Sequence, residues 1–209
     1  MDVRSTRSDD GISMISAAFP LQKQPAPPVI LLTPDPALAT PAGDWRPALA
    51  ALQAVLATRD ITIETVAWTE ASPAALARAP LVLPLLAWGY QHDPDRWQAS
   101  LVTWAQAGVR LANPAALLAW NSDKAYLQDL AQRSAPVAPA IFVDRLTIAA
   151  LNAAADRFGT PQLVAKPAIS ATAFQTIRWQ PGDGLAGGPA GRALIRPSCP
   201  QSPPTANSR

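Results

Sequence analysis

The sequence predicts an α/β fold in two parts, a parallel three-layer domain followed by a smaller α+β unit. Three short apolar runs, at 29–35, 61–68 and 80–88, are separated by segments with helical spacing. Buried strands that alternate with helices are typical of a parallel sheet covered on both faces. After residue 113 the predicted order changes to strand, helix, strand, strand, so we expect a second architecture there.

Composition argues against several classes of function. The chain has 209 residues, a net charge of +2, one cysteine (Cys199) and one histidine (His92). This charge, with no basic run among aromatics, indicates no nucleic-acid partner. No apolar stretch approaches the roughly 18 residues of a membrane span, and the N-terminus is unlike a signal peptide. We therefore expect a cytoplasmic protein with no membrane contact, no disulfide and no histidine-based metal site.

The first domain is expected over 29–113. Residues 1–28 are polar and then proline-rich, which predicts a disordered leader, and the start codon can be that of Met1 or Met14. Its expected strands are 29–35, 61–68, 80–88 and 109–113, and its expected helices are 44–60, 72–79 and 93–107.

The loop after the third strand, GYQHDPDRW (89–97), is polar. Ligands of open α/β sheets bind at the carboxyl ends of the strands, so His92 and Asp93 are candidate substrate contacts. Capping of the next helix by Asp93 or Asp95 is the alternative.

The second unit is expected over 114–197, with a disordered tail at 198–209. Asn113 and Pro114 open a short helix, and Asn121 or Ser122 caps the next one, which would place Lys124 in its first turn. The other expected elements are strands at 140–143, 162–167 and 176–179 and a helix at 147–159 that ends at a glycine.

Two lysines are unusual in this chain, which has three lysines and fourteen arginines. Lys124 opens an expected helix and Lys166 ends an expected strand. A lysine ammonium is a compact charge suited to a phosphate oxygen. The following stretch ISATA (169–173) could fold over phosphates and offer the Ser170 and Thr172 hydroxyls. Surface lysines beside an ordinary hairpin turn are the alternative interpretation.

Two stretches, NPAALLAWNSDKAYLQDLAQRSAPVAPAIFV (113–143) and LVAKPAISATAFQTIRW (163–179), resemble the ATP-grasp family. The resemblance is to its glutathione synthetase-like and cycloserine-ligase-like branch, and LLAWGYQHDPDRW (85–97) resembles the domain that precedes the ATP-grasp unit there. The resemblance implies an ATP-dependent carboxylate–amine ligase. ATP and Mg²⁺ would convert a small carboxylic acid to an acyl phosphate, which an amine attacks.

The resemblance also implies the roles of particular residues. Lys124 and Lys166 would contact the ATP phosphates, and Ser170 and Thr172 would lie in the loop that covers them. ALIRP (193–197), with Ile195 and Arg196, would be the hinge strand whose backbone contacts the adenine edge. No catalytic or metal-binding residue is carried over, and a homo-oligomer stays open.

The chain departs from the family after this strand. The family's Mg²⁺ ligands lie well downstream, whereas twelve residues follow Pro197. We therefore expect a truncated, catalytically incomplete ATP-binding chain whose large subdomain is missing. A shifted reading frame permits FLPSIATDGE after Pro197, which resembles the family's continuation, so we expect a frameshift. The alternative function is a non-catalytic α/β binding or interaction fragment.

Overall fold

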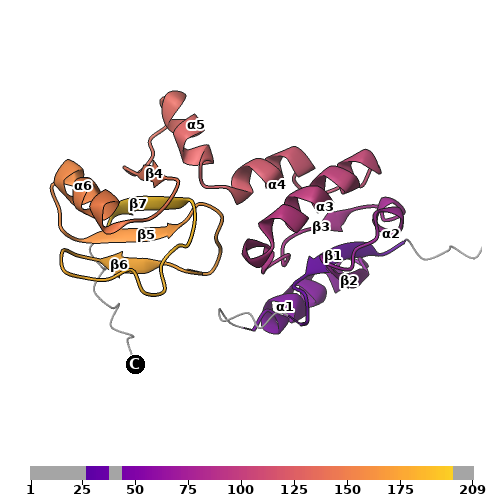
Figure 1. Cartoon of the computed structure of the whole chain (residues 1–209). Helices are drawn as coiled ribbons and strands as arrows, with labels where there is room; N and C mark the ends of the chain where they lie inside the picture. The colour runs from indigo at the N-terminus through magenta and orange to yellow at the C-terminus, as the bar shows by residue number, and fades with distance from the viewer. Residues whose placement is uncertain (1–26, 38–43, 200–209) are drawn as a thin grey trace, which may run out of the picture.

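The computed structural model describes residues 27–37 and 44–199, which form two lobes (Figure 1). The expected leader and tail lie almost entirely outside these ranges. Strands β1 to β3 belong to the first lobe and strands β4 to β7 to the second. No helix in the described part of the chain is both long enough and apolar enough to cross a membrane.

The first lobe is built on a parallel sheet with strand order β2-β1-β3. Its strands and helices are β1 (Val29–Thr33), α1 (Arg46–Ala57), β2 (Ile63–Ala67), α2 (Pro73–Ala77), β3 (Val82–Leu83), the 3-10 helix η1 (Tyr90–His92) and α3 (Pro94–Gln106). Figure 1 shows α1 below this sheet and α3 above it. Trp97, Leu101 and Trp104 of α3 are buried against the sheet, so the predicted three-layer arrangement is confirmed.

The predicted fourth strand at 109–113 is wrong, because only Leu111 pairs with the sheet, through a single parallel bridge to Val82. Val82 uses its N–H and C=O on that edge for Arg110 and Ala112. Successive residues of a parallel strand form backbone hydrogen bonds alternately with the two neighbouring strands. The next residue of this segment that could bond on the same edge as Val82 is therefore Pro84. Proline has no N–H to donate, and the ladder stops there.

The second lobe is an antiparallel sheet with strand order β4-β7-β5-β6. It contains β4 (Ile141–Val143), α6 (Ile148–Phe158), β5 (Leu163–Pro167), β6 (Ile177–Trp179) and β7 (Ala193–Pro197), close to the predicted ranges. One face of the sheet packs on α6 through Leu151, Leu163 and Ile195. Side chains alternate between the faces of a strand, so the register places a different set on the other face. That set is Phe142, Val164, Lys166, Arg178, Leu194 and Arg196.

The two lobes are joined through α4 (Ala115–Ser122) and α5 (Tyr126–Gln132). The prediction that one helix begins at Asn121 or Ser122 is wrong. Helix α4 continues through Ser122, and Asp123 is extended, with φ −99° and ψ 121°. Tertiary partners explain the break. Asp123 forms an antiparallel bridge with Ile169, and the Lys124 N–H donates to the Ala168 carbonyl at 2.9 Å.

The Ser122 hydroxyl is also unable to cap α5, because it is already engaged in the first lobe. It accepts from Trp97 Nε1 at 2.8 Å and donates to the Leu118 carbonyl at 2.6 Å. Lys124 therefore lies between two helices, not in a first helical turn.

Candidate functional site

Lys124 is the centre of a site between the lobes. Its Nζ donates to the main-chain oxygen of Ser170 at 2.6 Å and to the Ser170 hydroxyl oxygen at 2.8 Å. Burial, and to a lesser extent the charge of Lys166, lowers the pKa of Lys124 to about 8, while the charge of Asp123 acts in the opposite direction. Lys124 and Lys166, which the sequence singled out, are thus brought close together.

Lys166 extends this positive region across the sheet face that does not pack on α6. Burial lowers the pKa of Lys166, and the charge of Arg196 on the neighbouring strand β7 lowers it further. A lowered lysine pKa beside other cations means that the protonated, charged form is destabilised when no anion is bound. Phosphate oxygens bind such charges through short, charge-assisted hydrogen bonds. The arrangement therefore suits an anionic ligand.

The loop between β5 and β6 is folded back onto Lys124. Within this loop, Ser170 is buried and Thr172 is exposed. Thr172, Ala173 and Gln175 have positive φ values of 51°, 58° and 48°, which L-residues seldom adopt. The loop therefore has tight left-handed turns built without glycine. Of the two predicted hydroxyl residues, only Ser170 is placed at a lysine.

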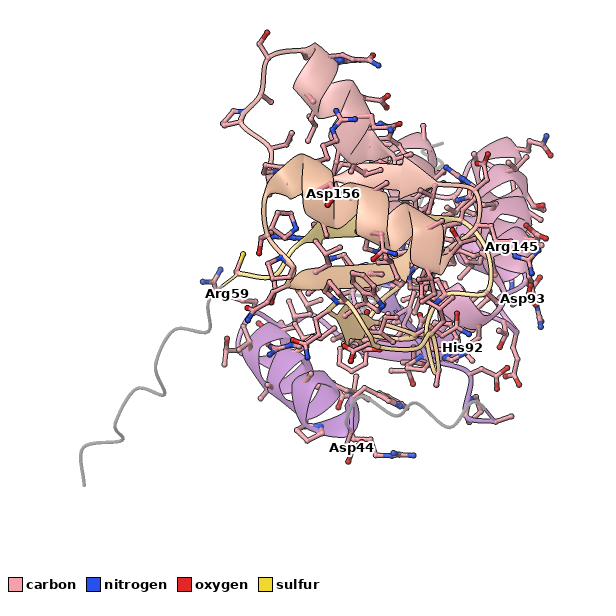
Figure 2. All side chains as sticks on the ribbon, turned by 60° about the vertical axis from the view of Figure 1, so that its left-hand side comes forward. Asp44, Arg59, His92, Asp93, Arg145 and Asp156 are labelled. Atoms are coloured by element: carbon pink, nitrogen blue, oxygen red, sulfur yellow. The ribbon has the colours of Figure 1, made fainter. Side chains whose placement is uncertain are left out.

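His92 and Asp93 lie on the same side of the molecule, at the end of the first lobe that approaches this loop (Figure 2). The His92 ring contacts the Phe174 ring of the loop, with centroids 4.5 Å apart and an interplanar angle of 67°. Asp93 Oδ1 accepts from the Arg96 N–H at 3.2 Å, so the alternative of helix capping is confirmed for Asp93. Contact of either residue with a substrate stays a prediction.

Ile195 and Arg196 occupy different faces of β7. Ile195 pairs with Ile141 and Ala165, and its buried side chain packs in the α6 core. Arg196 is opposite Val164 and shares the open face with Lys166. Only Arg196 can therefore present its side chain to a ligand on that face, and a base contact by either residue stays a prediction.

Sequence reasoning missed the contribution of Arg192. Its Nη1 pairs with Asp123 Oδ2 at 2.7 Å, and the two residues are 69 positions apart. Asp123 directly precedes Lys124 in the sequence. No local motif marks such a pair, because the fold alone brings the two segments together.

The site suits phosphate oxygens better than a metal ion. Hard cations such as Mg²⁺ take oxygen ligands, above all carboxylates. Among the residues that the structure describes, no group of three histidine, cysteine, aspartate or glutamate side chains could hold a metal. The carboxylate nearest in sequence to Lys124, that of Asp123, is already engaged by Arg192. These residues do not fit a metal site.

Comparisons with known proteins bear on the fold of the chain. Residues 29–113 match a family model described as the N-terminal domain of D-cycloserine synthetase DcsG. No curated protein matches the chain significantly.

Among solved structures, the crystal structure of D-cycloserine synthetase DcsG is 23% identical, with a TM-score of 0.63 over 81% of this chain and 59% of that chain. A RimK domain ATP-grasp protein from Sphaerobacter thermophilus is 19% identical, with a TM-score of 0.54 over 83% of this chain and 64% of that one. D-alanyl-alanine synthetase A from Vibrio cholerae is 14% identical, with a TM-score of 0.58 over 83% and 60%.

The chain has the fold of the ATP-grasp ligases, and the predicted resemblance and fold class are confirmed. Its first lobe matches the family model of the N-terminal domain of D-cycloserine synthetase DcsG. The chain spans less than two thirds of the length of these solved structures, between 59% and 64%.

Proposed function

We propose that this chain binds ATP through its phosphates, as the nucleotide-binding part of an ATP-dependent carboxylate–amine ligase, and that it does not complete ligation by itself. The observation that carries the proposal is the double contact of the Lys124 ammonium with Ser170 of the β5–β6 loop, within reach of the charge of Lys166. The ligase-like fold supports it.

The contacts of Lys124 indicate how a phosphate would be held. In the structure its ammonium donates to two oxygens of Ser170, which occupy the positions that phosphate oxygens would take. Exchange of these acceptors for an anion would relieve the repulsion between Lys124 and Lys166. Arg196 adds a planar, donor-only group next to Lys166 that can bond a phosphate or a base.

Mg²⁺ bound with the nucleotide would neutralise phosphate charge and polarise the transferred group. The proposal assigns it no ligand here, because the described residues near the lysines are cationic or already paired. We also propose that a small carboxylic acid binds near His92 and Asp93. We further propose a domain boundary at residue 113 and a cytoplasmic location. A homo-oligomer is compatible with the proposal.

The proposal is tested by calorimetric titration of the full chain with ATP and with adenosine, which has no phosphate. Lys124→Gln and Lys166→Gln should each weaken ATP binding about tenfold or more, as expected for a lost charge-assisted contact, and leave adenosine binding unchanged. Arg157→Ala is the matched control, because it removes one exposed cation from α6 on the opposite side of the sheet.

Wild-type protein that fails to bind ATP, or lysine variants that bind ATP as tightly as wild type, would contradict the proposal. Either result would favour the alternative, a non-catalytic binding or interaction fragment with the same fold. A chain that forms amides from ATP, an acid and an amine would contradict only the proposed incompleteness.

A further inference from the structure

Arg192 joins three segments that meet at Lys124. The main-chain oxygen of Arg192 accepts from the Ala168 N–H at 2.9 Å, and the Ala168 oxygen accepts from the Lys124 N–H at 2.9 Å. The guanidinium of Arg192 then reaches across to Asp123, next to Lys124. These contacts form a closed ring of interactions among three segments: the residues just before β7, the residues just after β5, and the α4–α5 connection.

The Asp123 carboxylate is held at both oxygens within this ring. Oδ2 accepts from Arg192, and Oδ1 accepts from the Ala125 N–H at 2.9 Å, where α5 begins. The main chain of Asp123 is bridged to Ile169 in the loop. With these contacts the residue before Lys124 has little freedom to move, which fixes the direction in which the Lys124 side chain leaves the main chain.

Charge gives Arg192 a second effect on the same lysine. The groups that act on the Lys124 ammonium are Asp123 on its own segment, Lys166 on β5 and the Ser170 oxygens of the loop. A free Asp123 carboxylate could turn toward Lys124 and compete with an incoming anion. Pairing with Arg192 holds that carboxylate in place and offsets its charge.

We propose that Arg192 is a positioning residue of the phosphate site, which acts through Asp123 to direct Lys124 toward the bound phosphate. The proposal rests on the proposed function. Arg192 itself needs no contact with the nucleotide. The ion pair is partly exposed, with side-chain exposures of 54% for Arg192 and 24% for Asp123, so its effect should be moderate.

The test is calorimetric titration of the full chain with ATP. Arg192→Ala should weaken ATP binding about three- to tenfold, the range expected for a partly exposed ion pair that orients a ligand group. Arg192→Lys, which keeps the charge, should recover most of this loss. Arg157→Ala should have no effect, although it lowers the net charge equally. In an Asp123→Asn background, Arg192→Ala should cause no further loss, because the partner through which it acts is gone.

The pH dependence separates positioning from a general structural role. In wild type, ATP affinity should fall as the pH rises through about 8, where Lys124 loses its proton. In Arg192→Ala the unpaired Asp123 carboxylate raises the pKa of Lys124, so this fall should move to higher pH. Loosened packing alone would lower affinity without moving the profile.

The outcomes are distinguishable. Wild-type protein without ATP affinity overturns the proposed function and this proposal with it. Wild-type protein that binds ATP, with an Arg192→Ala variant of equal affinity and unchanged pH profile, overturns only the positioning role. If Arg192→Ala does not fold, Arg192→Gln retains the length of the side chain and removes the charge, and the same two results decide.

Discussion

Lys124 combines a functional position with an unfavourable environment. An exposed lysine has a pKa near 10.5, and burial together with Lys166 lowers that of Lys124 to about 8. The unfolded chain therefore binds more protons than the folded chain between these two pKa values. The contribution of Lys124 to the free energy of unfolding should therefore rise as the pH increases from about 8 to 10.5.

Replacement of Lys124 by methionine removes this charge cost, about 1 kcal/mol at neutral pH once the partial exposure of the ammonium is allowed for, and also removes the two hydrogen bonds to Ser170. The stability of the variant relative to wild type should therefore fall as the pH rises toward 10, because wild-type Lys124 is then neutral too. Urea unfolding of both proteins at pH 7 and pH 10 measures this. A difference independent of pH would show that Lys124 is not titrating as described.

The residues of the site could be predicted from the sequence only where their residue type or their local sequence distinguished them. Lys124 and Lys166 were recognisable because the chain uses arginine almost everywhere else. Ser170 was recognisable as a hydroxyl in a small-residue loop. Arg192 was not, because nothing in its local sequence distinguishes it from the other arginines and its partner lies 69 residues away.

At the scale of elements, α6 shows how strictly a helix end can depend on one residue. Thr147 caps its start by accepting from the Ala150 N–H at 3.1 Å, and Gly159 ends it with φ +63°. A Cβ on Gly159 would meet no atom within 4 Å, so glycine is required here by the backbone conformation and not by space.

Gly159→Ala should therefore destabilise the second lobe by about 1 kcal/mol, the cost of a left-handed conformation for an L-residue. Gly184→Ala is the matched control. A Cβ there also meets nothing within 4 Å, and Gly184 has no left-handed φ, so little change in stability is expected. Thermal unfolding compares the two, and equal losses would mean that the conformation of Gly159 is not the cause.

Elements with a strong local pattern, including β1, β5 and α6, could be predicted well, whereas β7 was expected only from the family resemblance. Two of the errors, the fourth strand and the helix start at Ser122, share a physical origin. In each case the backbone partner is distant in sequence. Pro84 ends the ladder beside Leu111, and Ala168 takes the N–H of Lys124 that a helix cap would otherwise have satisfied. Local propensity carries no information about such partners.

At the scale of the whole molecule, each lobe has a hydrophobic core of its own. Leu101 is buried among Trp68, Trp97 and Trp104 in the first lobe, and Leu151 is buried against the second sheet. Polar and ring contacts of the α4–α5 connection and of the β5–β6 loop link the lobes. With separate cores linked in this way, we expect the two lobes to unfold separately.

Leu151→Ala should cost about 2–5 kcal/mol, and the loss should be confined to the second lobe. Amide hydrogen exchange should accelerate in β4 to β7 and stay unchanged in β1 and β2. Leu101→Ala should produce the reverse pattern. Acceleration throughout the chain in either variant would mean that the two lobes unfold as one cooperative unit.

The folded-back β5–β6 loop also affects the enthalpy and the association rate of ligand binding. Because the Ser170 oxygens already occupy the Lys124 ammonium, an arriving anion exchanges one set of hydrogen bonds for another. The net enthalpy of capture should then be small, and little chain entropy is lost, since the left-handed turns at Thr172, Ala173 and Gln175 are in place beforehand. Capture that replaces both Ser170 contacts requires their release, and the association rate would then be set by the opening of this loop more than by diffusion.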